Sequence, residues 1–309
     1  MTPPGAAPEA TADALISKRA FIAELADALR RRTGYAAGKL SYSHVHRLAY
    51  RVMSERLTHP ELFLRDAERM LRFESHDQLG IFPAAMEFYP RFDAFWVEHL
   101  RQLDCIGLFP TLMKPNLRIL RHYAVAGRRI DYHDQEPDRS SPSREQDCYL
   151  PLFAGRRLLL VCPFADLLRE RATRATFEAV WAKTGKRWFE PASVDSLEIP
   201  YGFARSTQVR YPTVIDLYER ITADLDAKRF DIALVAAAGL AVPIASHLKR
   251  RGHLAIDLGG HLQVLFGVLG KRWRDRVDWR ERYITDAWID MPARYRPEET
   301  GVCDDGAYW

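Results

Sequence analysis

Strands and helices alternate along the second half of this 309-residue chain, and that alternation limits the fold more than any other feature. Residues 157–162 (RLLLVC) form an apolar run of strand length, followed by the turn 163–166 (PFAD) and a helical pattern. Parallel strands need such crossovers, which are right-handed and place helices against the sheet. We therefore predict an α/β, Rossmann-like fold with a mostly parallel sheet covered by helices on both faces. The further elements predicted here are a helix over 214–225, a strand over 232–236, a helix over 242–249 and a strand over 254–258.

The first half of the chain shows similar but shorter patterns. Apolar side chains recur at helical spacing over 11–32, and aromatic ones do so over 87–103, which predicts two helices. Residues 104–109 (DCIGLF) then have the composition of a buried strand. We also predict a short strand over 39–43, a helix over 46–57 and a new helix that starts at Pro60.

The length and polarity of the chain indicate its division into parts. A chain of 309 residues can bury a large core without disulfides or metal. We predict a disordered tail over 1–10 and a single elaborated α/β domain over 11–309. Residues 135–146 (QEPDRSSPSREQ) contain no apolar side chain, so we expect a surface loop there and the best internal boundary.

Composition excludes several classes of protein. The net charge is +4 and the arginines are scattered, so we expect no nucleic-acid partner. No apolar run approaches the roughly 18 residues of a membrane span, so we expect no transmembrane segment and a cytoplasmic location, with peripheral contact at the inner membrane face left open. The four cysteines show no CxxC spacing, which predicts reduced thiols. Motifs of standard NAD, P-loop, nucleophilic hydrolase and metalloprotease sites are absent.

Residues that directly follow the apolar runs are the candidates for a site, because ligands bind beyond the carboxyl ends of parallel strands. Asp166 follows one such strand and can cap a helix or accept a ligand hydroxyl. Gly239 lies in a small-residue turn into a helix, where backbone N–H groups can face a diphosphate. The run 257–273 offers paired glycines for close approach, an amide to bind a base or sugar, and cations for phosphate. The ligand-binding candidates are Gly239, Asp257, Gly259, Gly260, Gln263, Gly267, Lys271, Arg272 and Trp273.

The stretch 236–273 resembles bacterial proteins related to the GT-D type glycosyltransferases. It contains their Gly-Gly-x-x-Gln-x-x-Phe-Gly-x-x-Gly-x-Arg-Trp run at 259–273. The turns 79–83 (LGIFP) and 163–166 and the closing 306–309 (GAYW) are similar too, so the resemblance covers most of 40–309. It implies a Rossmann-like GT-D fold, a nucleoside diphosphate sugar donor, often a UDP-sugar, and a glycan or glycolipid acceptor in the biosynthesis of surface polysaccharide or glycoprotein glycans.

One departure from the family concerns the metal. The GT-D enzymes place an Asp-x-Glu that serves a divalent ion after their first strand, whereas this chain has 43–47 (SHVHR) there. On an extended segment His44 and His46 would point the same way and could ligate Mn²⁺ or Zn²⁺, although Mg²⁺ prefers oxygen ligands. Direct contact with phosphate, which would make the site metal-independent, and a structural role are the other two interpretations.

The resemblance also sets expectations for mechanism. Backbone N–H groups near Gly239 and the paired glycines would hold the diphosphate, cations or a metal would offset its charge, and Asp166 or His46 would take the acceptor proton. A non-catalytic nucleotide-sugar-binding or assembly subunit of polysaccharide biosynthesis is the alternative, and a hydrolase with a histidine-bound metal is a third hypothesis. The terminal Tyr308 and Trp309 predict a tail that folds back onto the body, either on the core surface or over the cleft. The sequence does not determine the oligomeric state.

Overall fold

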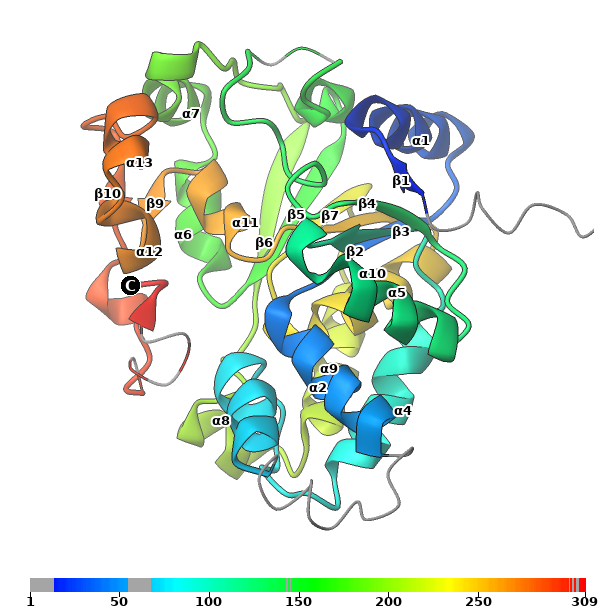
Figure 1. Ribbon diagram of the computed structural model, residues 1–309. Coiled ribbons are helices and arrows are strands. Elements are labelled where there is room, and N and C mark those ends of the chain that lie inside the picture. The colour runs from blue at the N-terminus through cyan, green and yellow to red at the C-terminus, as the bar shows by residue number, and fades with distance from the viewer. Residues whose placement is uncertain are drawn as a thin grey trace, which may run out of the picture.

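A parallel sheet of eight strands forms the centre of the protein (Figure 1). This computed structural model describes residues 14–54, 68–142, 144, 146–299, 301, 303 and 306–309. The strand order is β1-β4-β3-β2-β8-β7-β5-β6, and every pairing in the sheet is parallel, so the predicted α/β, Rossmann-like fold is confirmed. The strands are β1 Leu15–Ile16, β2 Tyr35–Leu40, β3 Cys105–Leu108, β4 Arg128–Asp131, β5 Arg157–Cys162, β6 Ser193–Glu198, β7 Ile232–Val235 and β8 Leu254–Asp257, with β9 Val268–Leu269 and β10 Ile289–Asp290 as a separate parallel pair.

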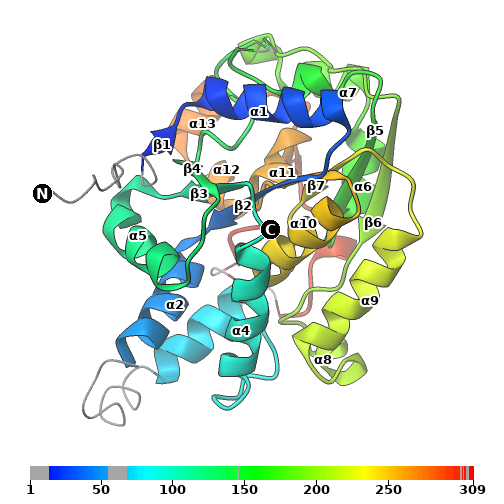
Figure 2. The ribbon, with the colours of Figure 1, turned by 90° about the vertical axis from the view of Figure 1, so that its right-hand side faces the viewer.

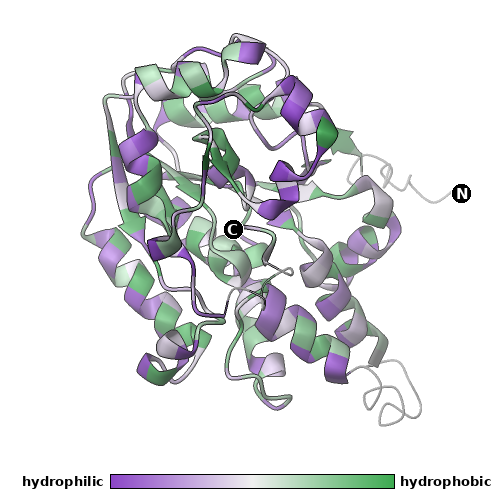
Figure 3. Ribbon diagram, turned by 90° about the vertical axis from the view of Figure 1, so that its left-hand side faces the viewer, coloured by the Kyte–Doolittle hydropathy of each residue, from purple (hydrophilic) through white to green (hydrophobic). Residues whose placement is uncertain are grey.

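Helices cover both faces of the sheet, with α1 and α7 on one side and α4, α5 and α9 on the other (Figure 2). Hydrophobic and hydrophilic residues alternate along these helices (Figure 3), so each can bury one side against the strands. The first face carries α1 Lys18–Arg31, α6 Ala165–Arg171, α7 Arg174–Val180, α11 His261–Leu265, α12 Lys271–Arg274 and α13 Val277–Arg282, and the second carries α2 Tyr42–Ser54, α4 Tyr89–Leu100, α5 Met113–His122, α9 Val214–Asp226 and α10 Ala241–Arg250. The shorter helices are α8 Arg205–Arg210, a π-helix at Phe73–Gln78 and 3₁₀ turns at Pro110–Leu112, Leu150–Phe153, Ala182–Thr184, Ala238–Leu240 and Ala293–Tyr295.

The ends of two N-terminal elements differ from their predictions. The helix expected over 11–32 begins only at Lys18, because the Ser17 hydroxyl accepts a hydrogen bond from the backbone N–H of Ala20 and caps it. The preceding Leu15–Ile16 pairs with β4 as an edge strand. The strand expected over 39–43 is β2, which starts earlier and is buried throughout, and the helix expected from residue 46 begins at Tyr42. Residues 1–13, with the predicted tail, and the helix start at Pro60 lie outside the described residues.

The segment 135–146 connects β4 to β5, and strands from both sides of it belong to the same sheet. Its described residues form turns and loop, as predicted, but the expectation of a surface loop is wrong at its start, where Gln135 and Glu136 are buried. The four cysteines are free and buried, which agrees with the predicted thiols. None of the described helices is long and apolar enough to cross a membrane.

Candidate functional site

The chain changes direction at the carboxyl edge of the sheet. The segments that follow β2 and β7 lead to α2 and α10 on one face, whereas those that follow β5 and β8 lead to α6 and α11 on the other. Strands β2 and β8 are neighbours at the centre of the sheet, so the chain leaves their carboxyl ends in opposite directions. Such a divergence opens a crevice that serves as the binding site in doubly wound proteins.

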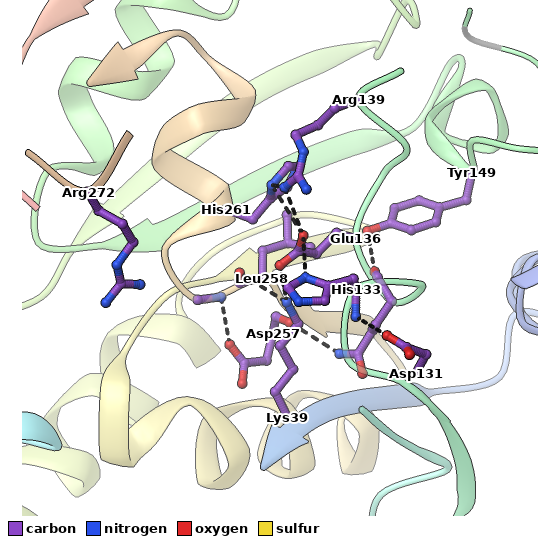
Figure 4. A network of polar contacts seen from close by, with 12 residues as sticks. Lys39, Asp131, His133, Glu136, Arg139, Tyr149, Asp257, Leu258, His261 and Arg272 are labelled. Carbon is purple, nitrogen blue, oxygen red and sulfur yellow. Dashed lines mark hydrogen bonds and ion pairs between the residues drawn. The ribbon is translucent and has the colours of Figure 1, made fainter. Parts of the chain in front are cut away.

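Four side chains form a charged cluster in this crevice: Lys39 near the end of β2, Glu136 and Arg139 in the loop after β4, and His261 in α11 (Figure 4). Arg139 is partly exposed, and the other three are buried. The Lys39 Nζ lies 2.7 Å from Oε1 of Glu136, and Arg139 Nη1 lies 3.2 Å from Oε2. His261 Nδ1 is 3.6 Å from Glu136 Oε2. Burial alone would raise the pKa of Glu136, but the charges of Lys39 and Arg139 bring that pKa well below its usual range. Burial lowers the pKa of His261 to about 3, so the imidazole is a neutral member of the cluster. Glu136 is therefore an anion that ties three elements together.

Asp257, the last residue of β8, lies beside this cluster with 5% of its surface exposed. Its Oδ1 accepts a hydrogen bond of 2.9 Å from the backbone N–H of Gly259, and its carbonyl oxygen accepts one of 3.1 Å from Gln135 Nε2. Burial raises the pKa of the Asp257 carboxyl to about 6, against the opposing effect of Lys39. At neutral pH this carboxylate is ionised and can accept a proton, which is the property of a general base.

An apolar pocket lies next to Asp257, beyond the ends of β5, β6, β7 and β8. Its volume is about 140 Å³, and among the described residues no charged side chain lines it. The C-terminal tail forms part of the wall, because Trp309 packs edge-on against Tyr201 at 5.4 Å and is 8% exposed. The predicted folding back of the tail is thus confirmed, and the tail both docks on the core and borders the pocket. The residues that line it are Gln78, Leu79, Gly80, Pro163, Phe164, Ile199, Pro200, Tyr201, Gly202, Phe203, Val214, Leu217, Ala236, Ala237, Ala238, Leu240, Gly259, Gly260, Cys303, Tyr308 and Trp309.

Tyr308 connects the apolar pocket to the charges around it. Its ring lies 4.9 Å from the guanidinium of Arg272, and its hydroxyl accepts a hydrogen bond of 3.5 Å from Arg272 Nη1. Burial raises the pKa of Tyr308, with Arg272 lowering it and Asp257 raising it. Figure 4 shows the Asp257 carboxylate pointing to the side where Arg272 lies. A cation and a proton acceptor therefore flank the same wall of the pocket.

The glycine and glutamine candidates occupy three different settings. Gly259 lines the pocket with a φ of +52°, a conformation that favours glycine, but its N–H donates to Asp257, so the expectation that this N–H holds a diphosphate is wrong. Gly260 leaves room for the Tyr308 ring, since a Cβ at this position would lie 2.8 Å from that ring. The prediction that the Gln263 amide binds a base or sugar is wrong, because its Nε2 donates to the carbonyl of Tyr308 at 3.0 Å. This hydrogen bond holds the C-terminal tail. A Cβ at Gly267 would lie 2.4 Å from a methyl group of Val180, so this glycine is needed for close packing and not for ligand contact.

Gly239 does not offer its N–H to a diphosphate, so that expectation is wrong. The N–H donates to the carbonyl of Leu79 at 3.0 Å, and the Gly239 carbonyl accepts from Trp96 Nε1 at 3.0 Å. A Cβ at this position would lie 2.7 Å from the Leu79 oxygen, which explains the need for glycine. The turn therefore joins the segment 79–83 to the end of β7.

The three candidates at 271–273 belong to the one-turn helix α12 and differ in their surroundings. Arg272 borders the pocket wall as described, and Lys271 is exposed. Trp273 is 7% exposed and packs at 6.2 Å from both Tyr308 and Trp279. Trp273 therefore supports the pocket wall from the interior side. Lys271 and Arg272 place their cationic groups at the surface.

His44 and His46 do not form a metal-ligating pair. They lie on helix α2 and not on an extended segment, and residues two apart on a helix face different directions. His44 is buried, stacks on Trp96 at 4.8 Å and lies 2.8 Å from the Ser41 hydroxyl, and burial lowers its pKa to about 3. His46 Nδ1 contacts Glu74 Oε1 at 2.8 Å. Within the ranges that the structure describes, no group of three or more His, Cys, Asp or Glu side chains could hold a metal ion.

Asp166 lies outside both the charged cluster and the lining of the pocket. It is in the first turn of α6, but the N-cap residue is Phe164, so the capping role is wrong. Its Oδ1 accepts a hydrogen bond of 2.5 Å from the Ser196 hydroxyl. Asp166 therefore links α6 to β6, and its selection as a base gains no support from this position.

Four members of the site were missed from the sequence: Lys39, Glu136, Arg139 and His261. The signal available was Lys39, a cation within a strand that is otherwise apolar, whereas Glu136 lies in a segment with the polarity of an exposed loop. Only the packing of that loop against β2 and α11 reveals its role. No family model matches the chain, and neither a curated protein nor a solved structure matches it significantly.

Proposed function

We propose that this protein transfers a sugar from a nucleoside diphosphate donor, which we expect to be a UDP-sugar, to a glycan or glycolipid acceptor. The observation that carries the proposal is the position of Asp257, a buried carboxylate with a raised pKa at the edge of the apolar pocket, where both Asp257 and Arg272 act on Tyr308. The crevice at the carboxyl edge of a parallel sheet is where such folds bind nucleotides. The similarity of the 259–273 run to the GT-D type glycosyltransferases supports the same reaction.

In this reaction the acceptor hydroxyl oxygen forms a bond to the anomeric carbon of the sugar, and the bond from that carbon to the phosphate oxygen breaks. Asp257 takes the proton of the hydroxyl, because its Oδ1 is fixed by Gly259 and its pKa is close enough to neutral for transfer in both directions. The nucleoside diphosphate leaves with additional negative charge. Arg272 and the exposed Lys271 are the cations that offset this charge.

Donor binding is tested by thermal unfolding with nucleoside diphosphates and their sugars, with and without Mn²⁺. A ligand that binds only the folded state raises the melting temperature by mass action. We expect a selective rise with one nucleotide family, and the effect of Mn²⁺ measures how far the ligand's own phosphates recruit a metal. Absence of a shift with every donor would contradict the proposal.

The role of Asp257 is tested by Asp257→Asn in a transfer assay. We expect turnover to fall by about 10²–10⁴-fold, the typical loss when a general base is removed, while donor binding is retained. The exposed Asp286 on the same C-terminal segment provides the matched control, since Asp286→Asn removes the same charge outside the site. Equal activity of the two variants would exclude Asp257 as the base.

A non-catalytic nucleotide-sugar-binding subunit is the second candidate. The placement of His44 and His46 on different sides of α2 favours it, because the end of β2 then lacks counterparts of the family's two metal carboxylates. The two functions differ in donor consumption. A binding subunit would raise its melting temperature with the donor and leave the donor intact in the presence of acceptors.

A further inference from the structure

The apolar pocket is unsuited to the charged part of a donor. No charged side chain is found among the described residues that line it, although Arg272 lies just outside on the other side of Tyr308. A diphosphate placed inside would lose its hydration without an ion partner, at a large cost. Whatever enters the pocket is therefore uncharged, and the phosphates belong on the Arg272 side of the wall.

The pocket is also poor in free polar groups. The Tyr201 hydroxyl donates to the carbonyl of Tyr295 at 2.9 Å, and the Tyr308 hydroxyl is bound to Arg272. The remaining side chains of the wall with a polar group are Gln78, Cys303 and Trp309, and the last of these has only its indole N–H. A sugar ring carries a hydroxyl on most of its carbons, and a nucleobase has donors and acceptors along its edges. Either would leave polar groups unsatisfied, which costs free energy.

Size and wall chemistry together favour a compact aromatic ring. The volume of about 140 Å³ is close to that of an engineered cavity of ~150 Å³ that holds benzene, and it is too short for a long acyl chain. Five aromatic side chains contribute to the walls, and aromatic rings favour stacked or edge-to-face contacts with one another. They are Phe164, Tyr201, Phe203, Tyr308 and Trp309.

We propose that the apolar pocket binds an uncharged aromatic ring carried by the acceptor. Gly259 lines the pocket and donates its N–H to Asp257, which puts the carboxylate directly behind this part of the wall. The proposed transfer then requires the acceptor hydroxyl to lie at the Gly259 side of the bound ring. The acceptor is then an aryl-bearing molecule and not a free sugar. The assignment of the ring to an acceptor rests on the proposed transfer function, whereas the preference for an aromatic ring follows from the pocket alone.

The experiment compares the binding of phenyl β-D-glucoside and methyl β-D-glucoside by isothermal titration calorimetry. Burial of the phenyl ring should make the phenyl compound bind at least about tenfold more tightly. Ala237→Phe places a ring in the space that the ligand would occupy and should abolish this preference. Ala182→Phe, at an exposed position of the 3₁₀ turn Ala182–Thr184, adds the same ring elsewhere and should keep it. Trp309→Leu keeps an apolar wall but removes an aromatic partner, and should reduce the preference several-fold.

Three results would overturn the proposal: equal binding of the two glucosides, an unchanged preference in folded Ala237→Phe, or displacement of phenyl β-D-glucoside by uridine, which would give the pocket to the donor base. These results are independent of the proposed function. Equal glucoside binding together with a thermal shift by a UDP-sugar rejects the acceptor site alone. A phenyl preference without any donor binding rejects sugar transfer but leaves the aromatic site in place.

Discussion

The charged cluster and the apolar pocket lie at the same edge of the sheet, but they are built in opposite ways. The cluster packs ionised groups such as Lys39 and Glu136 into the interior and gives each a partner. The pocket, by contrast, has apolar and aromatic walls without a charge among the described residues. Asp257 lies between the two regions, and burial destabilises its anion. The site therefore excludes charged side chains from the pocket and has one titratable carboxylate, Asp257, at the border of the pocket.

This contrast makes the two regions differ in what they tolerate. Removing one member of a buried ion pair leaves the other charged and without a partner, which is strongly destabilising. A change in a pocket wall alters contacts with a ligand and leaves no charge uncompensated. We therefore expect the cluster to control stability and the pocket to control specificity.

The largest effect is expected for Lys39→Met. It removes the 2.7 Å partner of the buried Glu136 and leaves Arg139, at 3.2 Å, as the remaining cation, so the free energy of unfolding should fall by up to about 3–5 kcal/mol. Lys249→Met is the matched control, because Lys249 forms an equally short pair with Asp104 but both side chains are partly exposed. That variant should lose about 1 kcal/mol or less. Urea unfolding at pH 7 measures both, and similar losses would show that burial does not distinguish the pairs.

The next effect concerns pH and Asp257. Its pKa is about 6 in the folded protein and near 3.8 without burial, so the folded state binds the proton more tightly. The contribution of this group to the free energy of unfolding is therefore greatest below about pH 4 and falls as pH rises to about 6, by on the order of 3 kcal/mol. Asp257→Asn should remove that fall and be more stable than the wild type at pH 7. Urea unfolding between pH 4 and pH 8 measures the difference.

Asp286→Asn provides the control for this pH series, because Asp286 is exposed. It should reproduce the wild-type slope. If Asp257→Asn and Asp286→Asn give the same pH dependence, the carboxyl of Asp257 is not desolvated, and the border between the two regions is more polar than its burial indicates.

The fold could be predicted from the sequence because its signals are local. The strands β5, β7 and β8 are short apolar runs that need helices on both faces, and α9 and α10 show their period directly. The errors occurred where a neighbour decides the outcome. Leu15 has the spacing of the helix that follows it, but pairing with β4 makes it part of a strand.

The site was harder to predict because its members come from distant segments. Glu136 belongs to a polar loop by composition, and only contact with Lys39, 97 positions earlier, makes it part of the interior. Similarly, the spacing of His44 and His46 predicts a shared ligand only if the segment is extended, and the start of α2 at Tyr42 removes that condition. Asp257 was selected as the first residue of the run 257–273 at the end of a predicted strand, and that rule depends on topology and not on distant partners.

The smallest effect is expected at Asp166, which lies at the carboxyl edge of the sheet but belongs to neither the charged cluster nor the pocket. Asp166→Ala removes the hydrogen bond from Ser196 and should lower the free energy of unfolding by about 0.5–1.5 kcal/mol. Because Asp166 lines neither the pocket nor the charged cluster, the rate of transfer should change by less than about threefold, a barrier change under ~0.7 kcal/mol. His46→Gln, which can still hydrogen-bond to Glu74, should behave in the same way. A loss of activity at Asp166 comparable to that of Asp257→Asn, with the fold intact, would move the chemistry from the end of β8 to the end of β5.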